Sequence, residues 1–322
     1  MRLVTINNSH EGQAGAIVGD DVLNFGAVTD LARPSLANWI PRSVIQILEG
    51  GPEGLAVAER FVKSVEDAND GVKSRLRETK ALTPLAGTPL LAPIPRPRIV
   101  FSTGMSYPSH DEEMVRAGAL KAMPPRRPFP PGFFKNTNAV SGPGQPIVLP
   151  KVAPDMVDWE CEVSFVIGRT CHAVTKDEAL GYVAGHTIMN DVSARNWVAE
   201  FAATGNMATN LLGKQFRSFC PIGPCIATAD EIPDPHDIDF SLALNGRVMQ
   251  RDNVKNSYFR IGDILAYYSQ WITFQPGDII SRGNPAGVGY AQSPPLYLKP
   301  GDTIEMHAKG IGAMTLPVAA EA

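Results

Sequence analysis

The sequence has no long hydrophobic run and few cysteines, and both absences narrow the class of protein. No stretch approaches the roughly 18 apolar residues that span a membrane, and the N-terminus lacks a signal-peptide core. The four cysteines stand at positions 161, 171, 220 and 225, where no pair has zinc-finger or Cys-x-x-Cys spacing. We therefore expect a cytoplasmic protein with reduced, buried thiols and no membrane partner.

Basic residues are not in excess. Lysine and arginine total 29 against 33 aspartates and glutamates, and the net charge is −4. No basic run is longer than Arg126-Arg127, so we expect no nucleic-acid partner. Glycine (29) and proline (28) are abundant instead, and they divide the chain into short segments. This pattern predicts an α+β fold that is mostly β, with many strands and turns.

The chain divides near residue 95 by its pattern. Residues 1–95 predict a small N-terminal α+β domain, and residues 96–322 a second, larger domain. The first 27 residues alternate as a β meander, and apolar residues recur at helical spacing from about residue 35 to residue 79, beginning with Trp39. We expect Gly50-Gly51-Pro52 to stop a first helix, and the five prolines of 82–97 to form an extended linker.

Three carboxylates alternate in the segment DWECEVSFVIG, which begins at Asp158. On a β-strand, Asp158, Glu160 and Glu162 share one face at steps of roughly 6.6 Å. Three neighbouring carboxylates repel each other, and a divalent cation with oxygen ligands removes that repulsion. The alternative is an ordinary solvated strand face, and this segment alone does not decide between the two.

A histidine and a glutamate lie three residues apart in YPSHDEEM. Ser109 and Glu112 have the spacing of a helix capping box, which places His110 and Glu113 on one face of the first turn. They are candidates for a proton-transfer pair in which the carboxylate orients the imidazole. The alternative is that the acidic residues only favour the positive end of the helix.

Two further segments are candidates for ligand contact. Asp191 stands where a predicted strand ends, a position from which ligands are often bound. The loop GNPAGVG, residues 283–289, holds three glycines that permit close backbone approach, or else forms an ordinary tight turn. The proline-rich residues 121–134 predict a surface loop that either covers a site, with Arg126 and Arg127 reaching a second substrate carboxylate, or has no functional role.

Residues of about 97–318 resemble the catalytic domain of the fumarylacetoacetate hydrolase family. The segments DWECEVSFVIG, NDVSAR, GK-x-F, CPIGP and GNPAGVG carry the resemblance, in the family's order. It implies a mixed β-sandwich roll, a homodimer, and Mg²⁺ or Mn²⁺ (Ca²⁺ as an occupant in crystals). The resemblance further implies that the metal ligands are Glu160, Glu162 and Asp191, with Asp158 close to them but not a ligand.

The resemblance also implies roles for the other candidates. His110 with Glu113 would act on water, and Lys214 would contact the substrate or a developing oxyanion. The implied substrate contacts are Tyr107, Lys135, Arg195, Gly283 and Asn284. Three departures concern the reaction rather than the metal site: Asn196 replaces an aspartate, Val198 a glutamine proposed as an oxyanion donor, and Asn284 a threonine.

The leading hypothesis is a metal-dependent hydrolase that cleaves a C–C bond of an acylpyruvate or β-diketo acid, as in aromatic catabolism. His110 would take a proton from water, and Lys214 and Arg195 would stabilise the resulting oxyanion. The alternatives are a decarboxylase, an isomerase or tautomerase, or a dehydratase acting on another 2-oxo acid such as oxaloacetate or a 2-keto-3-deoxy sugar acid. A non-catalytic small-molecule binding protein is the alternative from another class.

Overall fold

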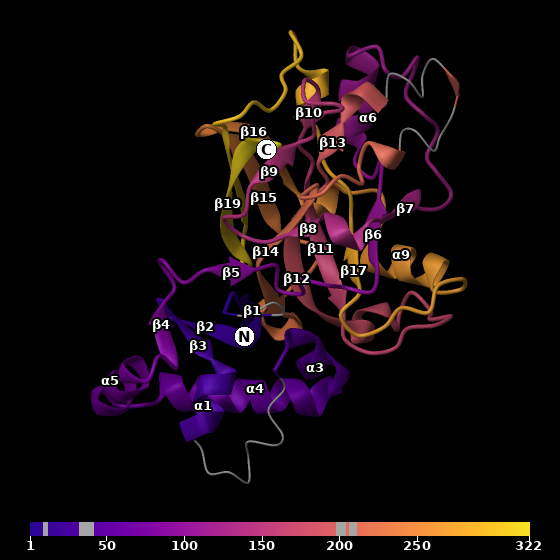
Figure 1. The fold of residues 1–322 in the computed structure, drawn as a ribbon. Helices are drawn as coiled ribbons and strands as arrows, with labels where there is room; N and C mark the ends of the chain where they lie inside the picture. Colours follow the sequence, from indigo (N-terminus) through magenta and orange to yellow (C-terminus); the bar gives the residue numbers. More distant parts are fainter. Residues whose placement is uncertain (9–11, 32–41, 198–203, 206–210) are drawn as a thin grey trace.

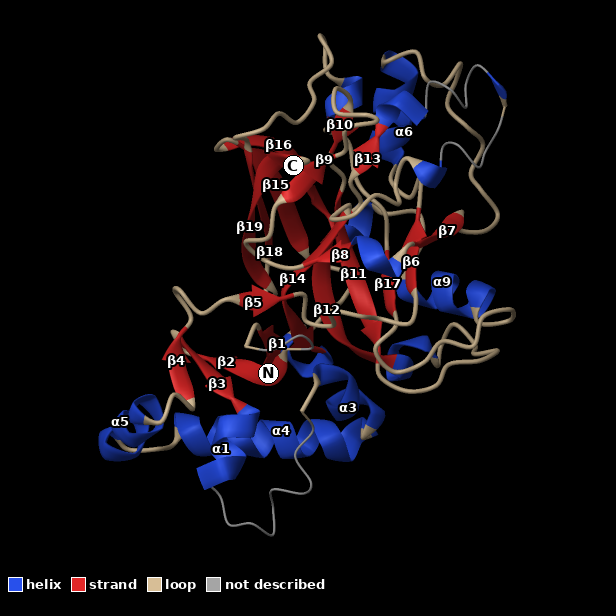
Figure 2. Cartoon of the chain, in the orientation of Figure 1, coloured by secondary structure: helices blue, strands red, loops and turns tan. Residues whose placement is uncertain are grey.

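The computed structural model describes residues 1–8, 12–31, 42–197, 204–205 and 211–322 (Figure 1). Strands form most of the upper body, and several helices lie below them at the N-terminal end (Figure 2). The expected α+β, mostly β class is therefore confirmed. None of the helices in these ranges is long and apolar enough to cross a bilayer. All four cysteines are buried and free of disulfides, as expected.

The largest sheet in the described chain has twelve strands, ten of them in the order β4-β3-β2-β1-β14-β12-β11-β17-β6-β7. Strand β5 pairs with β1, and β8 pairs with β14. Its strands are β1 (Arg2–Ile6), β2 (Gln13–Val18), β3 (Asp21–Asn24), β4 (Leu82–Pro84), β5 (Leu90–Leu91), β6 (Val100–Thr103), β7 (Gly132–Lys135), β8 (Val140–Ser141), β11 (Cys161–Ile167), β12 (Val183–Asn190), β14 (Cys220–Thr228) and β17 (Ile279–Ser281).

A second sheet has five strands, and a short pair stands apart. The five-stranded order is β16 (Arg247–Asn253), β15 (Asp239–Leu244), β18 (Thr303–Ala308), β19 (Gly312–Ala320) and β9 (Ile147–Leu149), and the pair is β10 (Val157–Asp158) with β13 (Ser193–Ala194). The largest buried cluster contains Val163 and Ile188 from the first sheet with Phe240, Leu242 and Met306 from the second. This shared core joins the two sheets as the expected sandwich.

The helices are short, as the glycine and proline content predicts. The α-helices are α1 (Phe25–Leu31), α3 (Val44–Glu49), α4 (Gly51–Glu66), α5 (Asp70–Glu78), α6 (Pro108–Arg116) and α9 (Ile261–Tyr268). The 3₁₀ turns are η1 (Thr137–Ala139), η2 (Ala179–Tyr182), η3 (Ala229–Glu231), η4 (Val254–Asn256) and η5 (Gly289–Ala291). Helices α3 and α4 pack against β1 and β2 and share their buried core.

Of two expectations for the N-terminal region, the helix stop at Gly50-Gly51-Pro52 is confirmed and the extended linker is wrong. Gly50-Gly51-Pro52 does end α3, but α4 begins at Gly51, because proline is compatible with the first turn of a helix. Residues 82–97 are not a free linker, since β4 pairs with β3 and β5 pairs with β1. Trp39 lies outside the described residues. The division at residue 95 stays a prediction, and β1 hydrogen-bonds to β14 across it.

The segment that carries the carboxylates is not one continuous strand. β10 ends at Asp158 and β11 begins at Cys161, so Trp159 and Glu160 form a break between them. Strand β11 pairs with β12 on one side and with β17 on the other, and all seven of its residues are buried. The alternative of an ordinary solvated strand face is therefore excluded.

Candidate metal centre and acid–base pair

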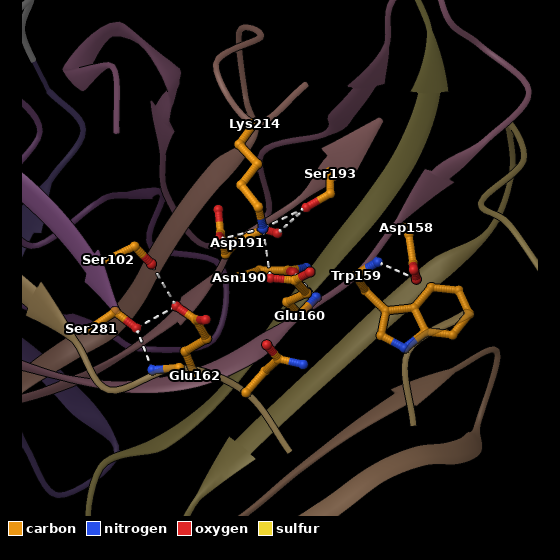
Figure 3. Close-up of polar contacts among 12 residues, drawn as sticks. Ser102, Asp158, Trp159, Glu160, Glu162, Asn190, Asp191, Ser193, Lys214 and Ser281 are labelled. Atoms are coloured by element: carbon orange, nitrogen blue, oxygen red, sulfur yellow. Dashed lines mark hydrogen bonds and ion pairs between the residues drawn. The ribbon is translucent and has the colours of Figure 1, made fainter. Parts of the chain in front are cut away.

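Three carboxylates meet at one end of strands β11 and β12 (Figure 3). Glu160 precedes β11, Glu162 lies within it, and Asp191 follows β12. The Asp191 amide donates to the Glu160 carbonyl at 2.9 Å, which joins the two strand ends. Each residue is buried, and one oxygen of each lies within 4.8 Å of the others. The predicted ligands therefore form one cluster, which we call the triad.

Two lysines and an arginine surround the triad. Lys214 donates 2.8 Å hydrogen bonds to Glu160 and Asp191 and a 2.9 Å bond to Ser193. Lys135 lies 2.6 Å from the other oxygen of Asp191. Arg195 contacts Glu160 at 2.7 Å. These cations offset much of the cost of burying the negative charge of the triad.

The two glutamates have opposite proton affinities although they are two residues apart. Burial by itself raises the pKa of Glu160, but Lys214 and Arg195 outweigh it and lower that pKa to about 2. Burial raises the pKa of Glu162 well above its usual value, and the charges of Asp191 and Glu160 raise it further. The hydroxyl groups of Ser102, at 3.1 Å, and Ser281 donate to Glu162. In the metal-free triad, the negative charges of Asp191 and Glu160 therefore disfavour a negative charge on Glu162.

The cluster suits a divalent cation because its donors are carboxylate oxygens, which hard ions such as Mg²⁺ and Mn²⁺ prefer. A carboxylate oxygen has two lone pairs, so one that already accepts a hydrogen bond can still bind an ion. A second positive charge beside Glu162 would also remove the repulsion that raises its pKa. The triad is therefore chemically suited to hold such an ion.

Asp158 lies beside the triad but is not part of it. Its carboxylate accepts from Arg195 at 2.8 Å and from the backbone amides of Trp159, Gly289 and Tyr290 at 2.7–3.0 Å. Arg195 thus bridges Asp158 and Glu160. Asp158 therefore lies near the triad, as expected, and its exclusion from the metal ligands stays a prediction.

His110 and Glu113 are in contact on α6, with the imidazole Nδ1 2.7 Å from the carboxylate. The second Glu113 oxygen accepts from the Gly287 amide at 2.7 Å, so the glycine-rich loop fixes this carboxylate. The expected capping box is wrong: the N-cap is Tyr107, and Ser109 donates to Asp252 instead. Pro108 begins the helix and still brings the histidine and glutamate onto one face.

The remaining predicted substrate contacts differ in how accessible they are. Tyr107 is fully buried with its ring against Phe240, so its predicted role requires a substrate that reaches the core. Lys135 is also buried, and its ammonium group is held by Asp191 and two carbonyls. Gly283 has a φ of 76°, and a side chain there would collide with Ser106. All three roles stay predictions.

Two of the three departures from the family pattern, Asn196 and Asn284, lie within the described residues. The Asn284 amide is buried and donates to the Pro285 carbonyl at 3.0 Å, so in this structure it is directed at the backbone. The side-chain oxygen of Asn196 is buried without a hydrogen-bond partner among the described residues. Val198 lies outside the described residues.

Several residues in contact with the triad were not predicted from the sequence. Ser102 of β6 and Ser281 of β17 reach Glu162, and Ser193 reaches Lys214. Asn190 accepts from the Glu160 amide at 2.9 Å and holds the break in the carboxylate segment. A single serine after an apolar strand is too common in sequences to indicate a site. The two serines can be recognised as part of the site only once the sheet brings β6 and β17 beside Glu162.

Comparison with known proteins gives the family. Residues 99–319 match the model described as fumarylacetoacetate (FAA) hydrolase C-terminal. The chain is 35% identical over 290 residues to the mitochondrial oxaloacetate tautomerase Fahd2a of Rattus norvegicus, covering 90% of this chain and 83% of the rat protein. It is 37% identical over 214 residues to 2,4-didehydro-3-deoxy-L-rhamnonate hydrolase of Sphingomonas sp. (strain SKA58), covering 66% and 70%.

A solved structure has a similar fold and contains a divalent metal ion. It is maleylpyruvate hydrolase from Sphingobium sp. SYK-6 in complex with manganese(II) ion and pyruvate, 26% identical, with a TM-score of 0.70 over the full length of both chains. The motifs, the sandwich and the family match all agree. The chain belongs to the fumarylacetoacetate hydrolase family.

Proposed function

We propose that this protein is a divalent-metal-dependent enzyme that acts on a 2-oxo acid through its enol or enolate. The observation that carries the proposal is the buried triad of Glu160, Glu162 and Asp191, with its oxygens within 4.8 Å of one another. The metal in the related maleylpyruvate hydrolase complex makes Mn²⁺ the first ion to test, with Mg²⁺ beside it. A bound ion would supply Lewis acidity and hold the acid's carboxylate and keto oxygens.

The residues around the triad supply proton transfer and charge stabilisation. His110 uses Nδ1 to contact Glu113, which leaves Nε2 as the nitrogen that accepts or returns a proton. Glu113, in contact with Nδ1 at 2.7 Å, orients the imidazole ring. Lys214 and Arg195 supply positive charge where an oxyanion would develop.

Two reactions fit these residues. In C–C hydrolysis of an acylpyruvate, His110 takes a proton from water, the hydroxide attacks the distal carbonyl, and the bond breaks with an enolate as leaving group. In tautomerisation of oxaloacetate, the same nitrogen moves a proton between carbon and solvent, and no bond between carbons breaks. The hydrolase relatives support the first reaction, and the 35% identical tautomerase supports the second.

A direct assay separates these reactions. The purified chain, loaded with Mn²⁺ or Mg²⁺, is mixed with enol-oxaloacetate, with acetylpyruvate and with a 2-keto-3-deoxy sugar acid. Ultraviolet absorbance follows the enol, and chromatography identifies pyruvate, acetate and CO₂. Loss of the enol with oxaloacetate intact indicates a tautomerase, whereas pyruvate with acetate indicates a hydrolase. Turnover without added metal would contradict the proposal.

Two substitutions separate metal binding from proton transfer. Glu160→Ala removes a ligand and should abolish both Mn²⁺ binding and turnover. His110→Ala should abolish turnover while Mn²⁺ still binds, since the imidazole is not one of the triad ligands. Calorimetric titration with Mn²⁺ measures the first property and the enol assay the second. Loss of the metal in both variants would contradict the assigned roles.

The assembly and location of the protein are further parts of the proposal. We expect a homodimer that takes only small-molecule partners, by resemblance to the family. Sedimentation velocity at micromolar concentration measures the assembly directly. The rat relative is named as mitochondrial, so the cytoplasmic location stays a prediction that microscopy of a tagged chain would test.

A further inference from the structure

The proline-rich loop before β7 is fastened at four points. We call residues 127–131 the strap. Arg127 binds α6, the Phe129 ring stacks on Tyr267 of α9 at 5.0 Å and 2°, and Tyr268 donates to the Pro130 carbonyl at 2.6 Å. The Pro131 carbonyl accepts from the Gly104 amide at 3.1 Å. The sequence predicts a covering loop here, and the structure shows a strap that connects α9 to the segment leading into α6.

Arg127 is the strap residue that reaches the candidate acid–base helix. Its two terminal nitrogens donate to the two oxygens of Asp111 at 2.9 and 3.2 Å, the geometry of a two-pronged ion pair. It also donates to the Met105 carbonyl at 3.2 Å, just before the helix. The predicted contact with a substrate carboxylate is therefore replaced by contact with the protein's own carboxylate.

Asp111 is a strong anchor because it is fully buried. Its side chain is 0% exposed, and Tyr258 donates to it at 3.3 Å beside Arg127. A buried carboxylate that loses its cation is costly, so the contact resists breaking. Met105 has a φ of 48°, a conformation uncommon for residues other than glycine, and Arg127 holds its carbonyl.

The two anchors of α6 lie on opposite sides of the helix. Residues two apart are about 200° apart around a helix axis, so Asp111 and Glu113 point in nearly opposite directions. The strap holds Asp111, and the Gly287 amide holds Glu113 at 2.7 Å. The helix that carries His110 is thus held by one contact on each side.

We propose that Arg127 is a positioning residue: through Asp111 it holds α6 at the rotation and height from which His110 reaches the substrate on the triad. The inference rests on the proposed function only in assigning proton transfer to His110. Proton transfer needs heavy atoms about 2.6–3.2 Å apart, and a displacement of about 1 Å can cost roughly a hundredfold in rate.

The test uses the full Mn²⁺-loaded chain with Arg127→Met, Arg127→Lys and His110→Gln, and with Arg127→Met combined with His110→Gln. Arg116→Met is the matched control, because it removes an exposed arginine from the same helix. The substrate is whichever of enol-oxaloacetate and acetylpyruvate the unchanged chain turns over. Calorimetric Mn²⁺ titration and hydrogen exchange of residues 105–117 accompany the kinetics.

We expect Arg127→Met to lower kcat about tenfold to a hundredfold, with KM and Mn²⁺ affinity within about twofold. Arg127→Lys keeps a positive charge but only one donor group for Asp111, so its kcat should lie between those of Arg127→Met and the unchanged chain. In the His110→Gln background Arg127→Met should cost nothing more, since it acts through the histidine. The amide hydrogens of residues 105–117 should exchange at least about tenfold faster in Arg127→Met, whereas their exchange rates should not change in Arg116→Met.

Four results would overturn the inference. They are an Arg127→Met variant as active as Arg116→Met, losses that multiply with His110→Gln, a parallel loss of Mn²⁺ affinity, or unchanged exchange of residues 105–117. The exchange result decides even if neither substrate is turned over. An inactive His110→Gln beside an active Arg127→Met removes only Arg127's role, whereas an active His110→Gln removes the proposed proton transfer.

Discussion

Two buried arginines of this protein lie in contrasting surroundings. Arg195 contacts two carboxylates, Asp158 and Glu160, and they raise its pKa although burial alone would lower it. Arg282 is 1% exposed, and among the described residues its guanidinium hydrogen-bonds to the Pro235 carbonyl at 2.8 Å and to His236 at 3.2 Å. Burial lowers the pKa of Arg282 to about 10.

The difference shows how the chain distributes buried charge. Near the triad, cations and carboxylates are interleaved, so Asp158, Glu160 and Asp191 are each in contact with a cation. Near Arg282 the hydrogen-bond acceptors are neutral, and its Nε has no hydrogen-bond partner among the described residues. This guanidinium is therefore buried without a hydrogen bond to a carboxylate, whereas Asp158 and Glu160 are each bonded to a cation. Substitutions of Arg195, of Arg282 and of His186 beside it test this difference.

Arg195→Met should have the largest effect on stability. It leaves Asp158 and Glu160 buried with less positive charge, and breaking a buried pair by removing one partner costs about 3–5 kcal/mol. Urea denaturation of the metal-free chain at pH 7.5 measures the change. A loss no larger than that of Arg282→Met would show that the backbone amides on Asp158 and the lysine on Glu160 suffice without the guanidinium.

Acid should weaken the Arg282 region through His186. Burial, followed by the charge of Arg282, lowers the pKa of His186 to about 3, so it stays neutral when folded. Below its ordinary pKa of 6.5 the unfolded chain binds the proton and the folded chain does not. Stability should therefore fall from about pH 6.5 towards pH 3, by up to about 1.4 kcal/mol per pH unit.

The measurement is urea denaturation at several pH values between 7.5 and 4.5, for the unchanged chain and for His186→Gln. The difference between the two curves isolates this histidine from the carboxylates that titrate in the same range. We expect the two free energies of unfolding to converge as the pH falls. Curves that stay parallel would show that His186 takes up its proton equally in both states.

Arg282→Met should have the smallest effect. It removes a donor from Pro235 and His236, but it leaves no carboxylate unpaired, so we expect a change of about 1 kcal/mol or less. Because Arg282 lowers the pKa of His186, its removal should also make the loss of stability in acid less steep. The same denaturation series measures both effects, and a cost as large as that of Arg195→Met would contradict the contrast.

Some features followed from the sequence because they depend on local spacing. The contact of His110 with Glu113 was predicted from three-residue helical spacing. The assembly of Glu160 and Glu162 with Asp191 came from motif resemblance, since nothing local relates positions 162 and 191.

Other features escaped because their partners are distant in sequence. The proline-rich 82–97 segment forms β4 and β5 only because β3 and β1 offer free edges. The predicted capping box at Ser109 does not form, because the helix already begins at Pro108 and the Ser109 hydroxyl donates to Asp252, 143 residues away. Arg127 was expected to face substrate, and its pairing with Asp111 depends on the path of the strap.

The sequence by itself determined the class of fold, because alternation and turn residues are local properties of the chain, and the order of its motifs indicated the family and the carboxylates of the triad. Only the tertiary structure decided the charge on each carboxylate. Glu160 and Glu162 are two residues apart and chemically identical, yet Lys214 and Arg195 stabilise the charge of one, while burial and neighbouring carboxylates oppose it on the other. Burial and the distances between charges exist only once the chain has folded.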